Sequence, residues 1–133
     1  MAAFRMAPSL ITGDIQIDNE HEHLLVLADR FADFLKANND EGCAGTIVEL
    51  TEALESHIEN EEKIMARYGY TNLEEHKEQH EKGKKRYDAL LKKTARHGYN
   101  NGFFDDLIAI LADDLITLDM DFRGYLKKMS HKG

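Results

Sequence analysis

The residues best suited to chemistry in this 133-residue chain are histidines and a glutamate that recur four positions apart. His57 and Glu61 form one such pair, and His76 and His80 form another. In an α-helix a residue four positions along returns to the same face, about 6 Å further up the axis. Each pair is therefore predicted to grip one metal ion, or one ion each of an adjacent pair. Imidazole suits iron, zinc or copper, and a carboxylate can bridge two ions.

The first pair falls where a helix should be apolar. Ile47, Leu50 and Leu54 recur at helical spacing, and continuing their period reaches His57 and Glu61. A polar side chain on a buried face needs a partner, because burying an unpartnered polar group is costly. Other potential ligands lie on the inner faces predicted for the neighbouring helices: His21, Asp114 and Asp119.

Each of these signals is weak by itself. One His-x-x-x-Glu pair is expected by chance in a chain with this many His and Glu residues, and His57 alone could equally be a hydrogen-bonded core histidine. His76 and His80 could form the polar edge of a lysine-rich helix, and Asp114 and Asp119 could belong to an exposed acidic face. The conjunction favours a metal site, because every histidine and glutamate of the set continues the apolar period of its own helix.

The periodicity predicts four helices, over about residues 19–37, 44–68, 73–97 and 103–129. Asp18 is the expected N-cap of the first helix. Helices of about 20 residues, each about 30 Å long, joined by short loops are typical of an antiparallel up-down-up-down four-helix bundle. The fold class is therefore predicted to be all-α. The chain is expected to form a single domain over 1–133, with an extended N-terminal arm over 1–16 and the bundle over 17–130.

This topology brings the candidate ligands to one end of the bundle. His21 lies near the start of the first helix, Glu61 near the end of the second, and His76 near the start of the third. These three places are level with one another in an antiparallel bundle. The later half of the fourth helix, which carries Asp114 and Asp119, returns to the same end. The candidate ligands of all four helices are therefore predicted to form one shared metal site.

The composition limits the partners and the compartment. The formal charge of −8 argues against a nucleic-acid binder, which needs cations for the phosphates, and against attraction to anionic membranes. Cys43, the single cysteine, is expected in a loop and cannot form an internal disulfide, so the predicted location is the cytoplasm. Neither a signal peptide nor a membrane span of about 20 apolar residues is recognised. A monomer or weak oligomer is expected, and the basic third helix leaves open an unknown acidic protein partner.

Four motifs in order resemble those of the hemerythrin family, above all its single-domain bacterial members. Residues 17–21 (Ile-Asp-Asn-Glu-His) resemble Ile-Asp-x-Gln-His, with glutamate in place of glutamine. Residues 57–65 resemble His-x-x-x-Glu-Glu-x-x-Met, and residues 69–80 contain a similar Gly-Tyr followed by His-x-x-x-His. Residues 119–126 resemble Asp-x-x-Tyr-x-x-Phe-Leu. The resemblance covers about residues 10–130.

The resemblance implies two non-haem iron ions, bridged by oxygen and two carboxylates, with reversible O2 binding at one iron. By position, Glu61 and Asp119 would be the bridging carboxylates. His21 and His57 would hold the iron that meets O2, and the histidine pair of the third helix would hold the other. An apolar O2 pocket would be formed by the four matching positions: Ile58, Ile110, Leu111 and Leu115.

One position departs from the family pattern. Five residues before Asp119 the family has a histidine that ligates the second iron, and this chain has Asp114. Asp114 could ligate directly or through a water, which is the favoured interpretation. It could instead turn away and leave an open position, or the chain could bind one metal or a different metal.

The predicted function is O2 binding by a di-iron centre, for carriage, local supply or sensing, with O2 or a small anion as the ligand. A catalytic role is not the leading expectation. Three alternatives remain: a di-iron oxidoreductase acting on peroxide or nitric oxide, a metal-binding or iron-storage protein without reversible O2 binding, and a metal-free interaction module.

Overall fold

All the regular structure in the described part of the chain is helical. The computed structural model describes residues 12, 14–113 and 119–132, with the backbone alone at 95–97, 119–121 and 129–132. The five helices are α1 (Ile15–Lys36), α2 (Asp40–Arg67), α3 (Leu73–His97), α4 (Asn101–Ala112) and α5 (Asp119–Lys132). The predicted all-α class is confirmed. No described helix combines the length and the apolar character that crossing a bilayer requires.

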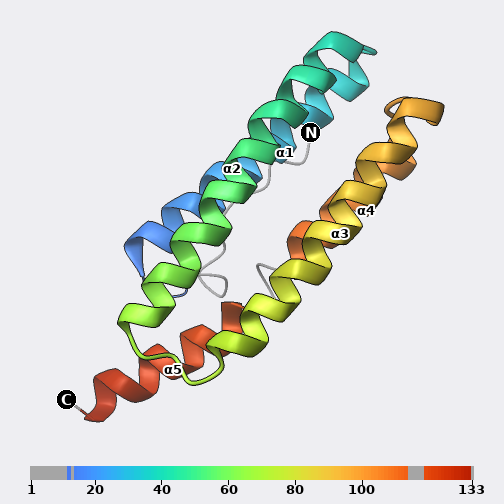
Figure 1. The fold of residues 1–133 in the computed structure, drawn as a ribbon. Coiled ribbons are helices and arrows are strands. Elements are labelled where there is room, and N and C mark those ends of the chain that lie inside the picture. Colours follow the sequence, from blue (N-terminus) through green and yellow to red (C-terminus); the bar gives the residue numbers. More distant parts are fainter. Residues whose placement is uncertain (1–11, 13, 114–118, 133) are drawn as a thin grey trace.

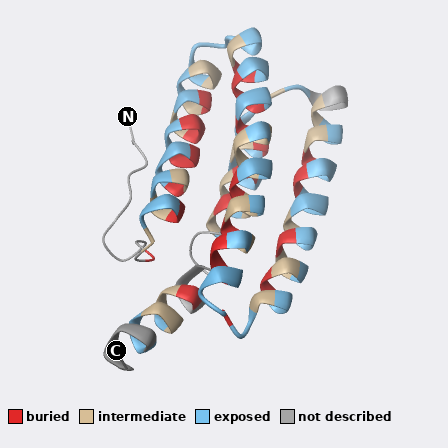
Figure 2. Ribbon diagram, turned by 60° about the vertical axis from the view of Figure 1, so that its left-hand side comes forward, coloured by how far each residue is buried: buried red, intermediate tan, exposed pale blue. Residues whose placement is uncertain are grey.

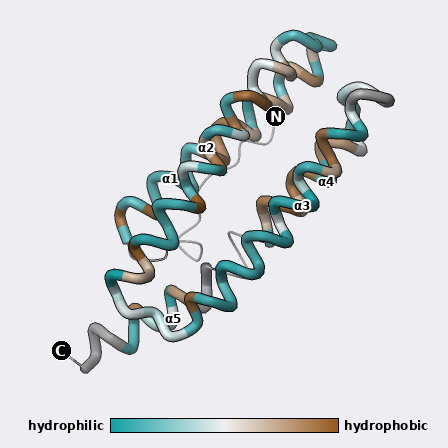
Figure 3. Tube along the Cα trace, in the orientation of Figure 1, coloured by the Kyte–Doolittle hydropathy of each residue, from teal (hydrophilic) through white to brown (hydrophobic). Residues whose placement is uncertain are grey.

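The long helices are arranged in two pairs. α1 packs along α2, and α3 lies beside α4 (Figure 1). Buried residues recur along one side of each long helix, and these sides face the interior (Figure 2). α3 is the most hydrophilic of the four, with long stretches of polar residues between its few buried positions (Figure 3). Its packing therefore depends on a narrow stripe rather than on a broad apolar face.

The core is divided into two apolar clusters. The larger cluster is built around Phe31 of α1 and Leu50 of α2, and it includes Leu107 of α4. The smaller cluster joins Ile17, at the start of α1, to Phe122 of α5. On α1, α2 and α3 the histidines and the glutamate singled out above lie in sequence between the residues of these two clusters. The fold therefore places a polar layer between two apolar ones.

α1 begins earlier than predicted. Its N-cap is Asp14, whose side chain accepts a hydrogen bond from the Ile17 N–H at 3.0 Å. Asp18 was the expected cap, but its carboxylate accepts from the backbone N–H and the hydroxyl of Thr12, both at 2.8 Å. The two aspartates are one helical turn apart, so the apolar period alone does not decide between them.

The predicted fourth helix over 103–129 is described in two parts, and residues 114–118 between them lie outside the described residues. The two parts are α4 and α5, and α5 lies at the end of the molecule where α2 passes into α3 (Figure 1). The Tyr125 hydroxyl of α5 donates to the backbone carbonyls of Tyr68 and Gly69 there, at 2.8 and 3.0 Å.

α2 also begins earlier than predicted, which places Cys43 within the helix. The side chain of Asn39 accepts from the Gly42 N–H at 2.9 Å and caps α2 at Asp40. Cys43 is therefore buried in the larger cluster rather than exposed in a loop. At the other end, Gly69 has a φ of 69°, as expected of a residue that terminates a helix.

Candidate metal centre

The histidines and the glutamate predicted from their spacing meet in one buried cluster. α1 contributes one, α2 two and α3 two, and each side chain is at most 4% exposed: His21, His57, Glu61, His76 and His80. Full burial of five polar groups is unusual, because such groups are normally found inside a protein only when they are paired or hold a metal.

Glu61 divides the cluster into two halves, one at each of its carboxylate oxygens. Its Oε2 atom lies 3.0 Å from His57 Nε2 and 3.3 Å from His21 Nε2. The two imidazole nitrogens are themselves 3.0 Å apart. These three groups form the first donor trio, supplied by α1 and α2.

The second trio is formed by the other oxygen of the same carboxylate and α3. Glu61 Oε1 lies 2.7 Å from His76 Nε2 and 3.1 Å from His80 Nε2. The two rings are four residues apart and meet edge to face, with centroids 4.3 Å apart. Both trios therefore point Nε2 atoms at one shared carboxylate.

The donor spacing fits metal ions. Two donors that bind one ion at about 2.1 Å and subtend about 90° are themselves about 3.0 Å apart. The donor separations within the first trio are 3.0, 3.0 and 3.3 Å. Those from Glu61 to the second trio are 2.7 and 3.1 Å. Three converging donors in each half, sharing one carboxylate, suit a pair of adjacent ions that favour nitrogen and oxygen ligands.

The shared carboxylate is held in its charged form. Burial alone would raise the pKa of the Glu61 carboxyl, but hydrogen bonds from the four imidazoles hold this pKa well below its usual value. An ionised carboxylate can use both oxygens as ligands at neutral pH.

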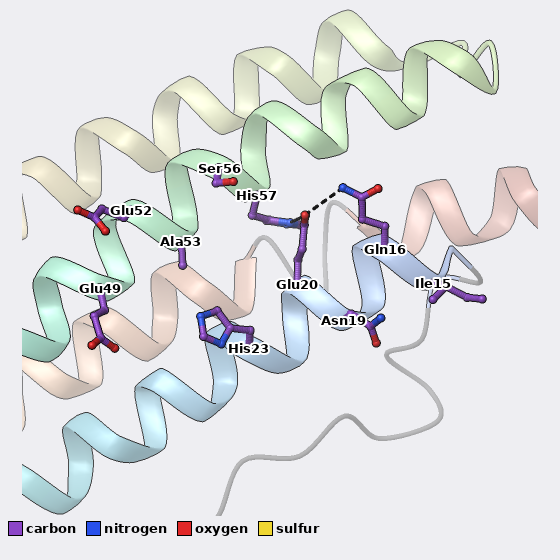
Figure 4. Close-up of a pocket in the computed structure, with 10 residues that line it drawn as sticks. All are labelled: Ile15, Gln16, Asn19, Glu20, His23, Glu49, Glu52, Ala53, Ser56 and His57. Carbon is purple, nitrogen blue, oxygen red and sulfur yellow. Dashed lines mark hydrogen bonds and ion pairs between the residues drawn. The ribbon is translucent and has the colours of Figure 1, made fainter.

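Glu20 supports the first trio from outside. Its Oε1 lies 2.8 Å from His57 Nδ1, and its Oε2 accepts from Asn60 at 2.8 Å and from Gln16 at 3.2 Å. Burial would raise the pKa of Glu20, but these hydrogen bonds together lower it. Figure 4 shows Glu20 rising from α1 to meet the outer edge of the His57 ring. A carboxylate at Nδ1 fixes the orientation of the ring and would, with a metal bound, favour the tautomer whose Nε2 lone pair faces the ion.

Glu62 performs the same task for the second trio. Its Oε2 lies 2.9 Å from His80 Nδ1. Glu20 and Glu62 lie within the motifs at residues 17–21 and 57–65, but neither was a predicted site residue. Their position next to predicted ligands was the available signal, since outer hydrogen-bond partners of ligating histidines are commonly carboxylates.

Two hollows approach the cluster from different sides. A groove of about 870 Å³ between α1 and α2 is lined by Glu20 and His57 together with mainly polar residues (Figure 4). A smaller cavity of about 80 Å³, between α2, α3 and α4, is lined by His80 and by several apolar side chains. Three of the four predicted O2-pocket residues lie in the wall of this cavity: Ile58, Ile110 and Leu111. The structure thus gathers these three residues around one cavity between α2, α3 and α4.

The remaining predicted residues are not placed by the structure. Asp114 and Leu115 lie outside the described residues. Asp119 is the first residue of α5, and its side chain is not described.

Comparison with known proteins agrees with this geometry. No curated protein and no solved structure gives a significant match to the chain. The family described as the hemerythrin HHE cation-binding domain matches residues 12–118, which span all five residues of the buried cluster. The chain therefore belongs to the hemerythrin HHE cation-binding family.

Proposed function

We propose that the protein binds two iron ions in the buried cluster and uses them to bind O2 reversibly. The observation that carries the proposal is the position of Glu61, whose two oxygens each face a separate pair of imidazoles. A carboxylate placed in this way can bridge two ions. Bound iron would supply the electrons that O2 binding requires.

The residues of the chain have distinct roles in this proposal. His21 and His57 hold one ion and the histidine pair of α3 holds the other, while Glu61 joins them. Asp119 is the proposed second bridge and Asp114 the proposed additional ligand, both on the resemblance to the family. Carboxylates add negative charge beside the ions, which favours the more highly charged ferric state. The protein would then be harder to reduce than a relative with histidine at position 114.

The surroundings of the cluster support binding rather than turnover. The apolar clusters above and below exclude water, which limits the protons available to a bound ligand. Cys43 offers no redox partner, since burial raises the pKa of its thiol and it is the only cysteine in the chain. A lone buried thiol is also compatible with the cytoplasmic location that we propose.

The first experiment is metal analysis of tag-free protein purified without chelators, comparing the native chain with Glu61→Gln. The matched control is Glu59→Gln, which removes a charge from the same helix at an exposed side chain paired with Lys63. We expect two irons per native chain and per Glu59→Gln chain, and loss of iron from both halves in Glu61→Gln. Reversible spectral change on cycling O2 over the reduced protein would then be measured.

The outcomes separate the functions. Two irons without reversible O2 binding would replace this proposal with iron storage or with turnover of peroxide or nitric oxide. One iron per chain, or two irons retained by Glu61→Gln, would contradict the shared-carboxylate site itself.

A further inference from the structure

The groove between α1 and α2 leads from the surface to the buried cluster (Figure 4). Most of its lining is exposed, including His23, Glu52 and Ser56. Among the described residues that line it, only His57 is buried, with 1% of its surface exposed. His57 belongs to the first donor trio. The groove therefore ends at a candidate ligand of the metal centre.

The groove has room for a hydrated metal ion. A cation with six bound waters occupies about 180 Å³, taking about 30 Å³ for each water. The groove holds about 870 Å³, whereas the cavity between α2, α3 and α4 holds about 80 Å³ and is largely apolar. An ion entering that cavity would have to leave its waters at an apolar wall, which is costly. Of these two hollows, the groove is the one that a hydrated ion can enter.

The charges of the groove attract cations. Its lining carries three carboxylates, those of Glu20, Glu49 and Glu52, and the described residues that form it include no lysine or arginine. Arg30 pairs with Glu49 at 2.7 Å, but both side chains are about half exposed, so this pair is weak. α2 has eight acidic and two basic residues, whereas α3 has eight basic and five acidic residues. A groove lined by one sign of charge raises the local concentration of the opposite ion, so cations gather between α1 and α2 rather than along α3.

The inner end of the groove is closed by a group that can itself ligate metal. The Glu20 side chain is 23% exposed, lines the groove and meets His57 Nδ1 through Oε1 at 2.8 Å. Its Oε2 accepts a hydrogen bond from Asn60. Since carboxylate oxygen and imidazole nitrogen both bind divalent ions, Glu20 can hold an arriving ion before His57 does. In Figure 4, His23 lies between Glu49 and Glu20 and offers a further nitrogen donor along the groove.

We propose that divalent metal ions reach the buried cluster through this groove, attracted by Glu49 and Glu52 and passed to His57 by Glu20. The inference rests on the metal centre of the proposed function and is independent of O2 binding. It gives the carboxylates of the groove a role in filling the site.

The first test blocks the groove without changing its charge. Ser56→Trp places an indole in the groove beside His57. Ala44→Trp is the control, because Ala44 is exposed on the same helix and does not line the groove. Metal-free, full-length protein is mixed with cobalt(II), whose absorption changes when imidazole replaces water, and uptake is followed by stopped flow. Release is followed after addition of excess chelator.

A route predicts equal changes in both directions. We expect Ser56→Trp to slow uptake and release by the same factor, about tenfold or more, equivalent to a barrier increase of about 1.4 kcal/mol. The affinity and the number of ions bound should match those of the native chain, because no donor of the cluster is altered. Ala44→Trp should match the native chain in every measurement. Weaker affinity with an unchanged uptake rate in Ser56→Trp would show a structural effect only and would overturn the route.

The second test removes the charge and keeps the shape. Glu49→Gln/Glu52→Gln is compared with Glu41→Gln/Glu55→Gln, which removes two exposed carboxylates of the same helix outside the groove. Charges act over about 10 Å at 0.1 M salt, so we expect uptake to slow about tenfold in the groove variant and less than about twofold in the control. At 1 M salt this distance is about 3 Å, and the two variants should differ little. Equal slowing of both variants at 0.1 M salt would overturn attraction by the groove.

Further readouts keep the outcomes separate. If circular dichroism shows that metal-free Ser56→Trp lacks native helicity, exchange of bound zinc for isotopically labelled zinc is measured in the loaded protein, and the same slowing is expected. Unchanged rates in both groove variants, in a chain that binds two irons and O2, would overturn the route and leave the proposed function intact. Slowed uptake in both groove variants, in a chain that does not bind O2 reversibly, would contradict the proposed function and support the route.

Discussion

Replacing Glu20 by glutamine tests whether the outer carboxylate tunes the metal centre. Glutamine has nearly the same size and is the residue found at this position in the motif that residues 17–21 resemble. Its amide has only one accepting oxygen, however. Glu20 uses both oxygens, one towards His57 Nδ1 and one towards the donating amides of Asn60 and Gln16. In either orientation the new NH₂ group faces a donor.

The expected magnitude follows from these contacts. The charged hydrogen bond to His57 becomes a neutral one of about half the strength, and at least one contact to Asn60 or His57 is lost. Removing such an outer partner typically weakens metal binding by about 10–100-fold, which is about 1.4–2.7 kcal/mol. The other half of the site is supported by Glu62 through His80 Nδ1, so it should keep its affinity in this variant.

The assay is a chelator-competition titration with zinc at fixed pH, which resolves two binding steps. Glu22→Gln is the control, because Glu22 is an exposed acidic residue on the same helix. We expect one step to weaken in Glu20→Gln and neither step to weaken in the control. The Nδ1 proton resonance of His57 should also shift, which a general loss of stability would not cause. Two unchanged steps, or equal weakening of both, would refute the assignment of Glu20 to one half.

Two further predictions concern packing and pH. Gly42→Ala should destabilise the fold by about 1–3 kcal/mol, because the added Cβ overlaps the ring of Phe34. Gly45→Ala, where a Cβ meets nothing, should be neutral or should stabilise the fold by up to about 1 kcal/mol. Urea unfolding that ranks the two variants the other way would contradict the packing of α1 on α2. Burial raises the pKa of Tyr87 from 10.0 to about 12, so its phenol is stabilised in the protonated form and this stability is present below pH 10 and lost as the pH rises towards 12. Burial and nearby acidic groups also raise the pKa of Tyr68 and of Tyr99. Absorbance titration at 295 nm should therefore show one late-ionising tyrosine fewer in Tyr87→Phe than in the native chain, and an unchanged titration would contradict the burial of Tyr87.

The cluster could be predicted from the sequence because the spacing that brings two ligands together is also the spacing of residues on one face of a helix. A residue four positions along lies on the same face, so His57 with Glu61 and His76 with His80 could be paired without a structure. Their burial followed from the apolar residues before and after them in each helix. Bringing the pairs together required only that successive helices be adjacent, which short loops enforce.

Features that depend on a single contact between side chains could not be predicted from the sequence. Asp14 and Asp18 are both good caps, and only the contacts of Thr12 with Asp18 free Asp14 for the helix end. The apolar period says which face is buried, but not which of the two apolar clusters it joins. Glu20 was missed as a partner of His57 because the two residues meet across helices.

The buried layer of four histidines and Glu61 is stable inside the fold only while all of its members are present. One ionised carboxylate, Glu61, is buried among four imidazoles, and each imidazole is at most 4% exposed. Removing any one of them would leave part of that charge without a partner, which costs more than the original contact contributes. The two apolar clusters on either side keep water from replacing the lost partner. The same dry surroundings that make the site costly to build make it suited to metal ions, because charged ligands bind a cation most strongly where water does not compete. Openings into such a layer must therefore be small and apolar, or sealed by a carboxylate as at Glu20, and the two hollows that reach this cluster have those two forms.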